Sequence, residues 1–327
     1  MRARAAMAAS LGVAVLFPAV APNDYYLYVM SLAFITAISA TGLNLILGYT
    51  GQLNLAHAGF MAVGAYATGL LTVDYGVGFW TAFALAVAVT AALGFLAGLV
   101  CLRLKTHYFT IFTLCVGFII YLVIEKFDGL THGTVGVIGI PAPTPIPTPF
   151  GAIAFDTPAA GYYLVLAFLV AALWVMHRIV GSLMGRAFMA VRNGEDLAEA
   201  LGINLMRTKI VAFVLSTAYA GLAGGLYAGF VRFLGPSLAL ESHTFEQVMF
   251  ILAGGLGTLF GPVLGTLALT WLTQSLQALE DYRMIVFGPM LILLVMHVPQ
   301  GLVGFLRERH APAPPTATAR KDAPANA

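Results

Sequence analysis

The chain has 327 residues, of which 60% are hydrophobic and only 9% are charged, and its mean hydropathy is +0.90. A soluble domain carries roughly a quarter charged residues, so this composition excludes a globular protein with a water-facing surface. The net charge is only +2, and no nucleic-acid partner is expected. The composition therefore predicts an all-α integral membrane protein surrounded by membrane lipid.

Apolar runs near 20 residues, the length that crosses a hydrocarbon core of about 30 Å, recur along almost the whole chain. Several runs are short or broken by glycine, so some helices are not expected to cross fully. We expect a polytopic bundle of about 9–10 helices over residues 1–306. The predicted spans are approximately 6–21, 26–47, 52–73, 78–101, 107–124, 161–178, 209–232, 245–260, 263–279 and 284–303.

The first run also has features of a secretory leader. Arg2 and Arg4 precede a short apolar stretch, and Ala19-Val20-Ala21 is a possible cleavage site. A retained helix is the favoured interpretation. Cleavage would leave nine spans and would not change the side on which the C-terminus lies.

The basic residues predict the orientation of the chain. With a cytoplasmic N-terminus and alternating spans, only Lys126, Arg232 and Arg283 of the 16 Lys and Arg residues fall outside. This is a strong positive-inside bias, which predicts a plasma-membrane protein with both termini in the cytoplasm.

Two hydrophilic segments are not expected to be helical. Residues 126–160 form an external loop with proline at alternate positions from Pro141 to Pro149, which favours an extended chain. Residues 307–327 form an Ala/Pro/Thr tail with mixed charges, predicted to be disordered and cytoplasmic.

Several motifs of catalysis are absent from the sequence. None of the lysines is preceded by glycine, so the chain has no nucleotide-binding G-x-x-x-x-G-K-[ST] loop, and H-E-x-x-H and G-x-S-x-G are also missing. The carboxylates fall almost wholly in loops and at span ends, which argues against a membrane enzyme and against proton coupling. We expect no enzymatic activity, no cofactor and no metal site.

The segment 41–60 is the densest polar stretch at membrane depth. Residues 48–51 predict a break between helices, which would place Gln52 in the first turn of the next helix. Asn54 and His57 would then share one helix face. Such side chains either line a solute path or form hydrogen bonds between helices, and both interpretations stay open. The candidate path residues are Asn44, Gln52, Asn54 and His57.

Glycines repeat every fourth residue in two places, at Gly221, Gly225 and Gly229 and at Gly257, Gly261 and Gly265. Such stripes of small residues predict close contacts between helices in lipid.

The cytoplasmic connection 179–208 has an ordered pattern. A short helix is predicted near 185–191 and a second one from Glu195 and Asp196 to a stop at Gly202. Leu197, Ala198 and Leu201 would form a small apolar face without a membrane to bury it. This face indicates docking to a partner, and a loop packed on itself is the alternative.

Several separated motifs, in the same order, resemble the LivM-type permeases of branched-chain amino acid ABC importers. They are Leu43-Asn44-Leu45-Ile46-Leu47-Gly48-Tyr49-Thr50-Gly51-Gln52 with Ala58-Gly59-Phe60, Tyr108-Phe109-Thr110-Ile111, Gly129-Leu130-Thr131 to Gly139-Ile140-Pro141, Glu199-Ala200-Leu201-Gly202-Ile203-Asn204, Gly254-Gly255-Leu256-Gly257-Thr258 with Gly261-Pro262, and Pro299-Gln300-Gly301-Leu302.

The resemblance implies a fold of the vitamin-B12-importer (type II) kind and a permease that acts in the inner membrane. It implies four partners: a LivH-type permease paralogue, two cytoplasmic ATPase subunits and a periplasmic solute-binding protein. It also implies that the second short helix of 179–208 couples the permease to an ATPase. The family's Glu-Ala-Ala…Gly motif is degenerate here, because Asp196-Leu197-Ala198 precedes Gly202. The coupling residues expected on this basis are Arg186, Arg192, Glu195, Asp196, Leu197, Glu199, Leu201 and Gly202.

The cargo that the resemblance implies is a branched-chain or related hydrophobic amino acid. The alternatives are the same machine with urea, short amides or aromatic acids as cargo, and a stand-alone channel or secondary transporter.

Overall fold

The computed structural model describes residues 12–103, 106–148, 151–155 and 157–275. Residues 12–20 are helical. The long helices are α2 (Asp24–Asn44), α4 (Phe79–Cys101), α5 (Thr106–Lys126), α7 (Pro158–Val180) and α10 (Leu205–Val231). The shorter helices are α3 (His57–Val73), α6 (Asp128–Thr131), α8 (Leu183–Asn193), α9 (Glu195–Ala200), α11 (Glu241–Gly254), α12 (Gly261–Ser275), the π-helix η1 (Leu45–Tyr49) and the 3₁₀-helix η2 (Pro236–Ala239).

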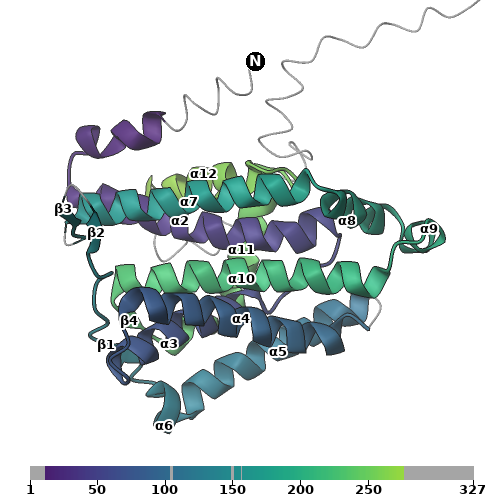
Figure 1. The fold of residues 1–327 in the computed structure, drawn as a ribbon, viewed down its shortest axis with the longest axis horizontal. Coiled ribbons are helices and arrows are strands. Elements are labelled where there is room, and N and C mark those ends of the chain that lie inside the picture. Colours follow the sequence, from purple (N-terminus) through teal and green to yellow (C-terminus); the bar gives the residue numbers. More distant parts are fainter. Residues whose placement is uncertain (1–11, 104–105, 149–150, 156, 276–327) are drawn as a thin grey trace, which may run out of the picture.

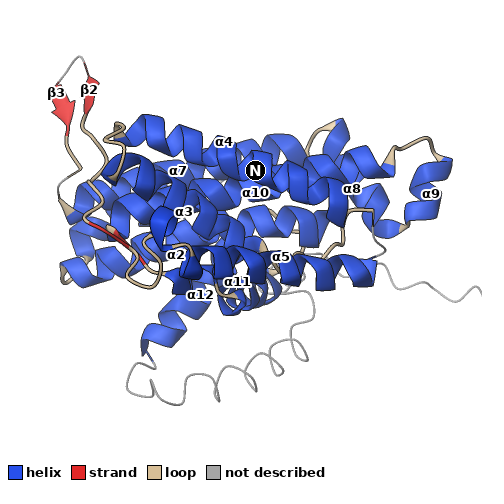
Figure 2. Cartoon of the chain, turned by 90° about the horizontal axis from the view of Figure 1, so that it is seen from below, coloured by secondary structure: helices blue, strands red, loops and turns tan. Residues whose placement is uncertain are grey.

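The long helices lie side by side as a bundle, with different segments at its two ends (Figure 1). Helices α8 and α9 project from one end, which we call the α9 end. The opposite end, which we call the strand end, carries α6 and two short antiparallel pairs. One pair joins β1 (Val137–Ile138) to β4 (Phe233–Leu234), and the other joins β2 (Ile146–Thr148) to β3 (Gly151–Ile153). The turned view in Figure 2 keeps β2 and β3 at one end and α9 at the other.

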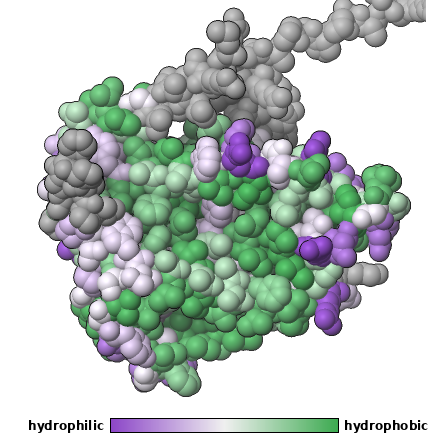
Figure 3. Space-filling view, viewed as in Figure 1, coloured by the Kyte–Doolittle hydropathy of each residue, from purple (hydrophilic) through white to green (hydrophobic). Residues whose placement is uncertain are grey.

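The bundle confirms an all-α polytopic membrane protein. Among the described residues, five helices are long and apolar enough to cross a membrane, namely Asp24–Tyr49, Phe79–Cys101, Tyr108–Lys126, Pro158–Val180 and Leu205–Val231. Outward-facing side chains of these helices are large and apolar, for example Leu96, Ile111 and Trp174. Figure 3 shows this apolar surface over the flank of the bundle, with hydrophilic residues gathered toward the α9 end. Such a flank suits contact with lipid rather than water.

Helix α2 is the central helix, since it contacts α7, α10, α11 and α12. Its second half is buried almost without interruption, from Ala37 to Asn44. Polar side chains in this buried half need partners from other helices, because lipid supplies none. The candidate functional site lies there.

The glycine stripe of α10 makes the close contacts that its spacing predicts. A methyl group added to Gly221 would stand 2.7 Å from Thr90 Cβ, and one added to Gly225 would stand 2.6 Å from the Phe83 ring. Both neighbours belong to α4, so the absence of side chains lets α10 and α4 pack closely.

Most of the predicted elements agree with the structure, with local differences at their ends. The segment 126–160, predicted to be a non-helical loop, contains the one-turn helix α6, which corrects that prediction. Its part between α6 and α7 carries the strands β1, β2 and β3, as expected for an extended chain. The connection between α7 and α10 contains the two predicted short helices. The span 284–303, the Pro299 motif and the tail 307–327 lie outside the described residues.

Candidate functional site

Helix α2 ends in a break that brings non-helical backbone into the bundle. After the π-helical turn, Gly51 adopts φ +76° and the chain stays irregular until α3 begins at His57. Residues 54–56 are buried, and the His57 ring reaches the carbonyl of Ser39, well inside α2. Irregular backbone at this depth is tolerated only where protein surrounds it or where it lines a water-filled cavity.

The break corrects two predictions about helix α3. Gln52 does not lie in its first turn, and Asn54 and His57 do not share a helix face, because the helix starts five residues later than expected. The reason is that the backbone amides just before His57 donate to side chains and not to helical carbonyls. The amide of Ala56 donates to Asn54 Oδ1 at 3.0 Å, and that of Leu55 donates to Thr113 Oγ1 at 3.1 Å.

His57 is fully buried, with both ring nitrogens engaged. Nε2 lies 2.9 Å from the Ser39 carbonyl, and Nδ1 lies 3.4 Å from the Ser216 hydroxyl. A carbonyl can only accept, so Nε2 carries a proton, and in the neutral ring Nδ1 then accepts from the Ser216 hydroxyl. His57 thus connects α3 to both α2 and α10.

Asn44 joins α2 to the connection between α11 and α12. Its Nδ2 donates to the Thr258 carbonyl at 2.9 Å, and its Oδ1 accepts from the Gly257 amide at 2.9 Å. Gly257 adopts φ +71°, so the connection is a second break that depends on glycine. A methyl group on Gly48 would lie 2.5 Å from the Gly257 nitrogen, so the two breaks touch. Paired interruptions of apolar segments mark the solute sites of many transporters.

Gln52 and Asn54 differ from the other two candidates, because each has a polar atom without a partner. Among the described side chains, Gln52 Oε1, Asn54 Nδ2 and Thr266 Oγ1 are buried with no hydrogen-bond partner. Gln52 is 4% exposed and Asn54 is 0% exposed. A buried amide atom without a partner costs about 1–3 kcal/mol, so these two atoms are the candidates for contact with water or solute.

At the α9 end, helix α8 contacts the first break directly. Arg192 Nη1 donates to the Gly48 carbonyl, and a methyl group on Gly51 would stand 3.3 Å from Arg192 Cγ. Ser182 caps the N-terminus of helix α8, and its hydroxyl accepts from the Gly185 amide. Among the predicted coupling residues, Arg192 is therefore the one that reaches the predicted path segment.

Helix α9 presents a smaller apolar face than the sequence suggested. Leu197 is 67% exposed and Leu201 is 71% exposed, but Ala198 is 1% exposed. The prediction for Ala198 is wrong, because this side chain faces the rest of the protein. Gly202 ends the helix with φ +83°, as expected. Of the remaining predicted coupling residues, Arg186, Asp196 and Glu199 are exposed.

Glu195 forms an ion pair with a lysine that was not predicted from the sequence to take part in the site. Lys209 Nζ lies 2.7 Å from the Glu195 carboxylate, with side-chain exposures of 9% and 40%. Ser39, Thr244 and Gln247 were likewise not predicted from the sequence. Ser39 Oγ donates to Gln247 Oε1 at 2.9 Å, and the Ala58 amide donates to Thr244 Oγ1 at 2.9 Å. Ser39 is a polar residue inside an apolar run, which was an available signal, whereas Thr244 and Gln247 lie in the polar stretch 241–247.

The fold and this site define a membrane permease: an apolar helical bundle, two broken segments that meet inside it, and a polar hairpin of short helices at one end. No group of three or more His, Cys, Asp or Glu residues suited to a metal ion occurs in the part of the chain that the structure describes. The chain belongs to the family of branched-chain amino acid transport system permease components, whose sequence profile matches residues 25–295.

Relatives in bacteria and archaea support this assignment. The chain is 34% identical to the high-affinity branched-chain amino acid transport system permease protein LivM of Escherichia coli, over 85% of this chain and 70% of that protein. It is 24% identical to LivH of the same organism, over 82% of this chain and 91% of LivH. It is also 24% identical to a probable LivM of Methanocaldococcus jannaschii, over 81% and 89% of the two chains. No solved structure matches the chain.

Proposed function

We propose that this permease forms one half of the pore of an ATP-driven importer of branched-chain or related hydrophobic amino acids. A LivH-type paralogue forms the other half, two separate ATPases supply the energy, and a periplasmic solute-binding protein delivers the cargo. The architecture is of the vitamin-B12-importer kind, and the protein acts in the bacterial inner membrane. Support comes from the names of the LivM and LivH relatives and from the geometry of α8 and α9.

The single observation that carries the proposal is the exposed leucine pair on α9. Leu197 lies in α9, Leu201 caps its C-terminus one turn later, and both side chains are exposed. Helix α9 itself projects from the end of the bundle (Figure 1). Apolar side chains presented on a short helix outside the bundle suit insertion into a hydrophobic groove of a partner. Lys209 holds the other side of this helix through Glu195, so the helix can transmit force rather than swing freely.

The charges favour a cytoplasmic location for this end. Arg103 follows α4 there, and the basic residues from α7 to the start of α10 are Arg178, Arg186, Arg192, Arg207 and Lys209. Lys126 and Arg232 end helices at the opposite, strand end. By the positive-inside rule the α9 end faces the cytoplasm, where ATPases are found. The strand end then faces the periplasm and offers a docking surface to the binding protein.

Within the bundle, Gln52 and Asn54 would face the solute path, and Asn44 and His57 would hold the surrounding segments in place. Arg192 connects α8 to the Gly48 break, so movement of α8 and α9 against an ATPase would move that break. Alternate opening of the two sides of the pore follows when the ATPases bind and hydrolyse ATP.

The test is purification of the tagged permease from its native membrane in mild detergent. We expect a second permease and two P-loop ATPases to co-purify, and ATP-dependent uptake of leucine in proteoliposomes supplied with the binding protein. Leu201→Asp should release the ATPases, because it puts a charge on the apolar face. The matched control is Leu130→Asp, since Leu130 is also exposed, at 51%, on the short helix α6 at the opposite end.

Two results would count against the proposal. A chain that purifies alone and carries solute without ATP would be a channel or a secondary transporter. An ATP-driven complex that imports urea or an aromatic acid in place of leucine would support the importer mechanism but contradict the proposed cargo.

A further inference from the structure

A cavity of about 420 Å³ opens at the strand end of the bundle. It lies between the first turns of α2 and α7, the last turn of α10 and the start of α4, beneath Pro143 and Phe155. Its volume is within the range of about 300–1,000 Å³ that is typical of small-molecule sites. The predicted path residues and the coupling residues lie elsewhere, so this cavity is not part of the site described above.

The floor of the cavity is apolar and firmly packed. Phe79 is 1% exposed, Val165 is 2% exposed and Leu226 is 3% exposed. The Phe230 ring lies against that of Tyr28, with 5.3 Å between the centroids, and closes one side. A buried aliphatic and aromatic floor of this kind favours a branched or aromatic side chain over a polar one.

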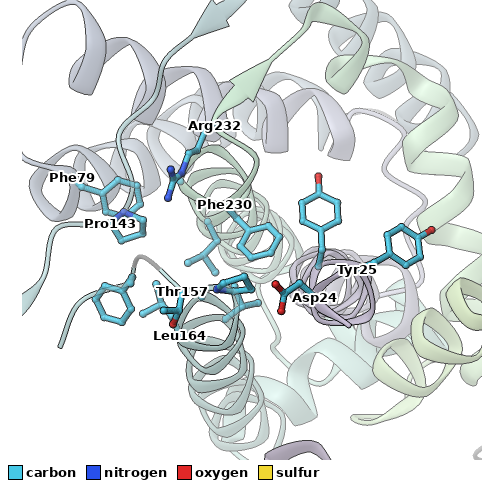
Figure 4. Close-up of a pocket in the computed structure, with 15 residues that line it drawn as sticks. Asp24, Tyr25, Phe79, Pro143, Thr157, Leu164, Phe230 and Arg232 are labelled. Atoms are coloured by element: carbon cyan, nitrogen blue, oxygen red, sulfur yellow. The ribbon is translucent and has the colours of Figure 1, made fainter. Parts of the chain in front are cut away.

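The rim of the cavity carries one negative and one positive charge. Among the described residues, neither the Asp24 carboxylate nor the Arg232 guanidinium has an ion-pair or hydrogen-bond partner. In Figure 4 the two side chains lie apart around the cavity, with Phe230 between them in the view. The two side chains therefore do not pair with each other.

The backbone conformation of Arg232 is a second sign that this residue has a function. Arg232 ends α10 with φ +61°, a conformation that glycine usually adopts at a helix C-terminus. A non-glycine residue there costs free energy, and such residues cluster at functional sites. Glycine would be the usual residue at this position, and arginine differs from it by the guanidinium group. We therefore connect any function of this residue with the guanidinium at the rim of the cavity.

We propose that this cavity is an outer binding site for a free zwitterionic amino acid with an apolar side chain. Arg232 binds the α-carboxylate, for which the planar guanidinium is suited, and Asp24 binds the α-ammonium. The side chain of the ligand lies on Phe79, Val165 and Leu226. The inference rests on the proposed function and deepens it, because it gives this permease its own selection for the α-carboxylate and the α-ammonium of the cargo.

The experiment uses the complete transporter in nanodiscs, without ATP and without binding protein. Binding of radiolabelled L-leucine is measured, together with competition by L-leucinamide, which lacks the carboxylate, and by 4-methylpentanoate, which lacks the ammonium. The variants are Asp24→Asn and Arg232→Gly. Glycine suits the backbone at position 232, so Arg232→Gly removes the guanidinium without straining the fold. The control is Lys126→Gln, an exposed cation at the same end and outside the cavity.

We expect saturable leucine binding to the unaltered transporter and to the control, with both analogues much weaker than leucine. Each cavity variant should weaken leucine binding about tenfold, because it removes a hydrogen bond to a charged group. Arg232→Gly should also make leucine and leucinamide bind alike, and Asp24→Asn should do the same for leucine and 4-methylpentanoate. A purely structural role of either residue would not change these ratios.

The inference is overturned if the transporter binds no leucine, or if both variants bind it as the unaltered protein does. A phospholipid that co-purifies and is lost on Arg232→Gly would also overturn it, since the cavity would then hold lipid. ATP-driven leucine uptake that is unaffected by both variants would leave the proposed function standing without this site. A complex that imports a different solute would remove the proposed function itself.

Discussion

The ammonium group of Lys209 lies 2.7 Å from the carboxylate of Glu195 and joins α9 to α10. The two side chains differ in exposure, since the lysine is 9% exposed and the glutamate 40%. Removing the glutamate leaves a buried charge without a partner, and removing the lysine leaves a carboxylate that water can reach.

We therefore predict that Glu195→Gln destabilises the protein by about 1–3 kcal/mol, less than a fully buried pair because Glu195 is half-exposed. Lys209→Met should cost less. The measurement is the thermal unfolding midpoint of the purified protein, with Glu199→Gln as the exposed control on the same helix. Equal losses for the two partners would show that the asymmetric burial of the pair is unimportant.

Arg192 is predicted to couple ATP hydrolysis to transport. Arg192→Gln removes the hydrogen bond from α8 to the Gly48 carbonyl but leaves the leucines of α9 in place. ATPases should still bind and hydrolyse ATP, while the amount of solute moved per ATP falls at least tenfold. Arg207→Gln is the control, because Arg207 is an exposed arginine at the same end of the bundle and is not among the predicted coupling residues. Loss of ATPase binding in Arg192→Gln would instead make Arg192 a docking residue.

Gln52 is predicted to matter for transport more than for stability. Its Oε1 has no partner in the described structure, so Gln52→Leu removes a desolvated atom and should change the unfolding midpoint little. Uptake should nevertheless fall, since the polar lining of the path is reduced. Thr266→Val is the control, as it removes another buried atom without a partner. Normal uptake by Gln52→Leu would exclude Gln52 from the path.

Gly225 is predicted to be essential for packing. Leucine at this position would place a Cβ atom 2.6 Å from the Phe83 ring and 3.0 Å from Thr68 Oγ1. Such overpacking costs about 1–3 kcal/mol or forces the helices apart. The unfolding midpoint of Gly225→Leu should drop sharply, while Gly129→Leu, where no atom lies within 4 Å of the added carbon, should not. Unchanged stability in both variants would contradict the close α10–α4 contact.

The amino-acid sequence by itself determined the membrane class, most of the helices and the two short helices between α7 and α10. These features follow from local properties, because lipid forces every backbone group into helical hydrogen bonds and glycine interrupts them. The breaks near Gly48 and Gly202 were predicted for the same reason. The close packing of Gly221 and Gly225 was predicted because small residues at helical spacing allow helices to approach.

Only the tertiary structure decided what the polar residues do. The start of α3 at His57 depends on a hydrogen bond between Leu55 and Thr113, which lie 58 residues apart. Three further features likewise depend on which helices become neighbours. Ala198 is buried, Lys209 pairs with Glu195, and Arg192 donates to the Gly48 carbonyl. Hydropathy reports the environment of a segment but not its partners. Hydrogen bonds and ion pairs between distant segments therefore fixed the geometry of the site.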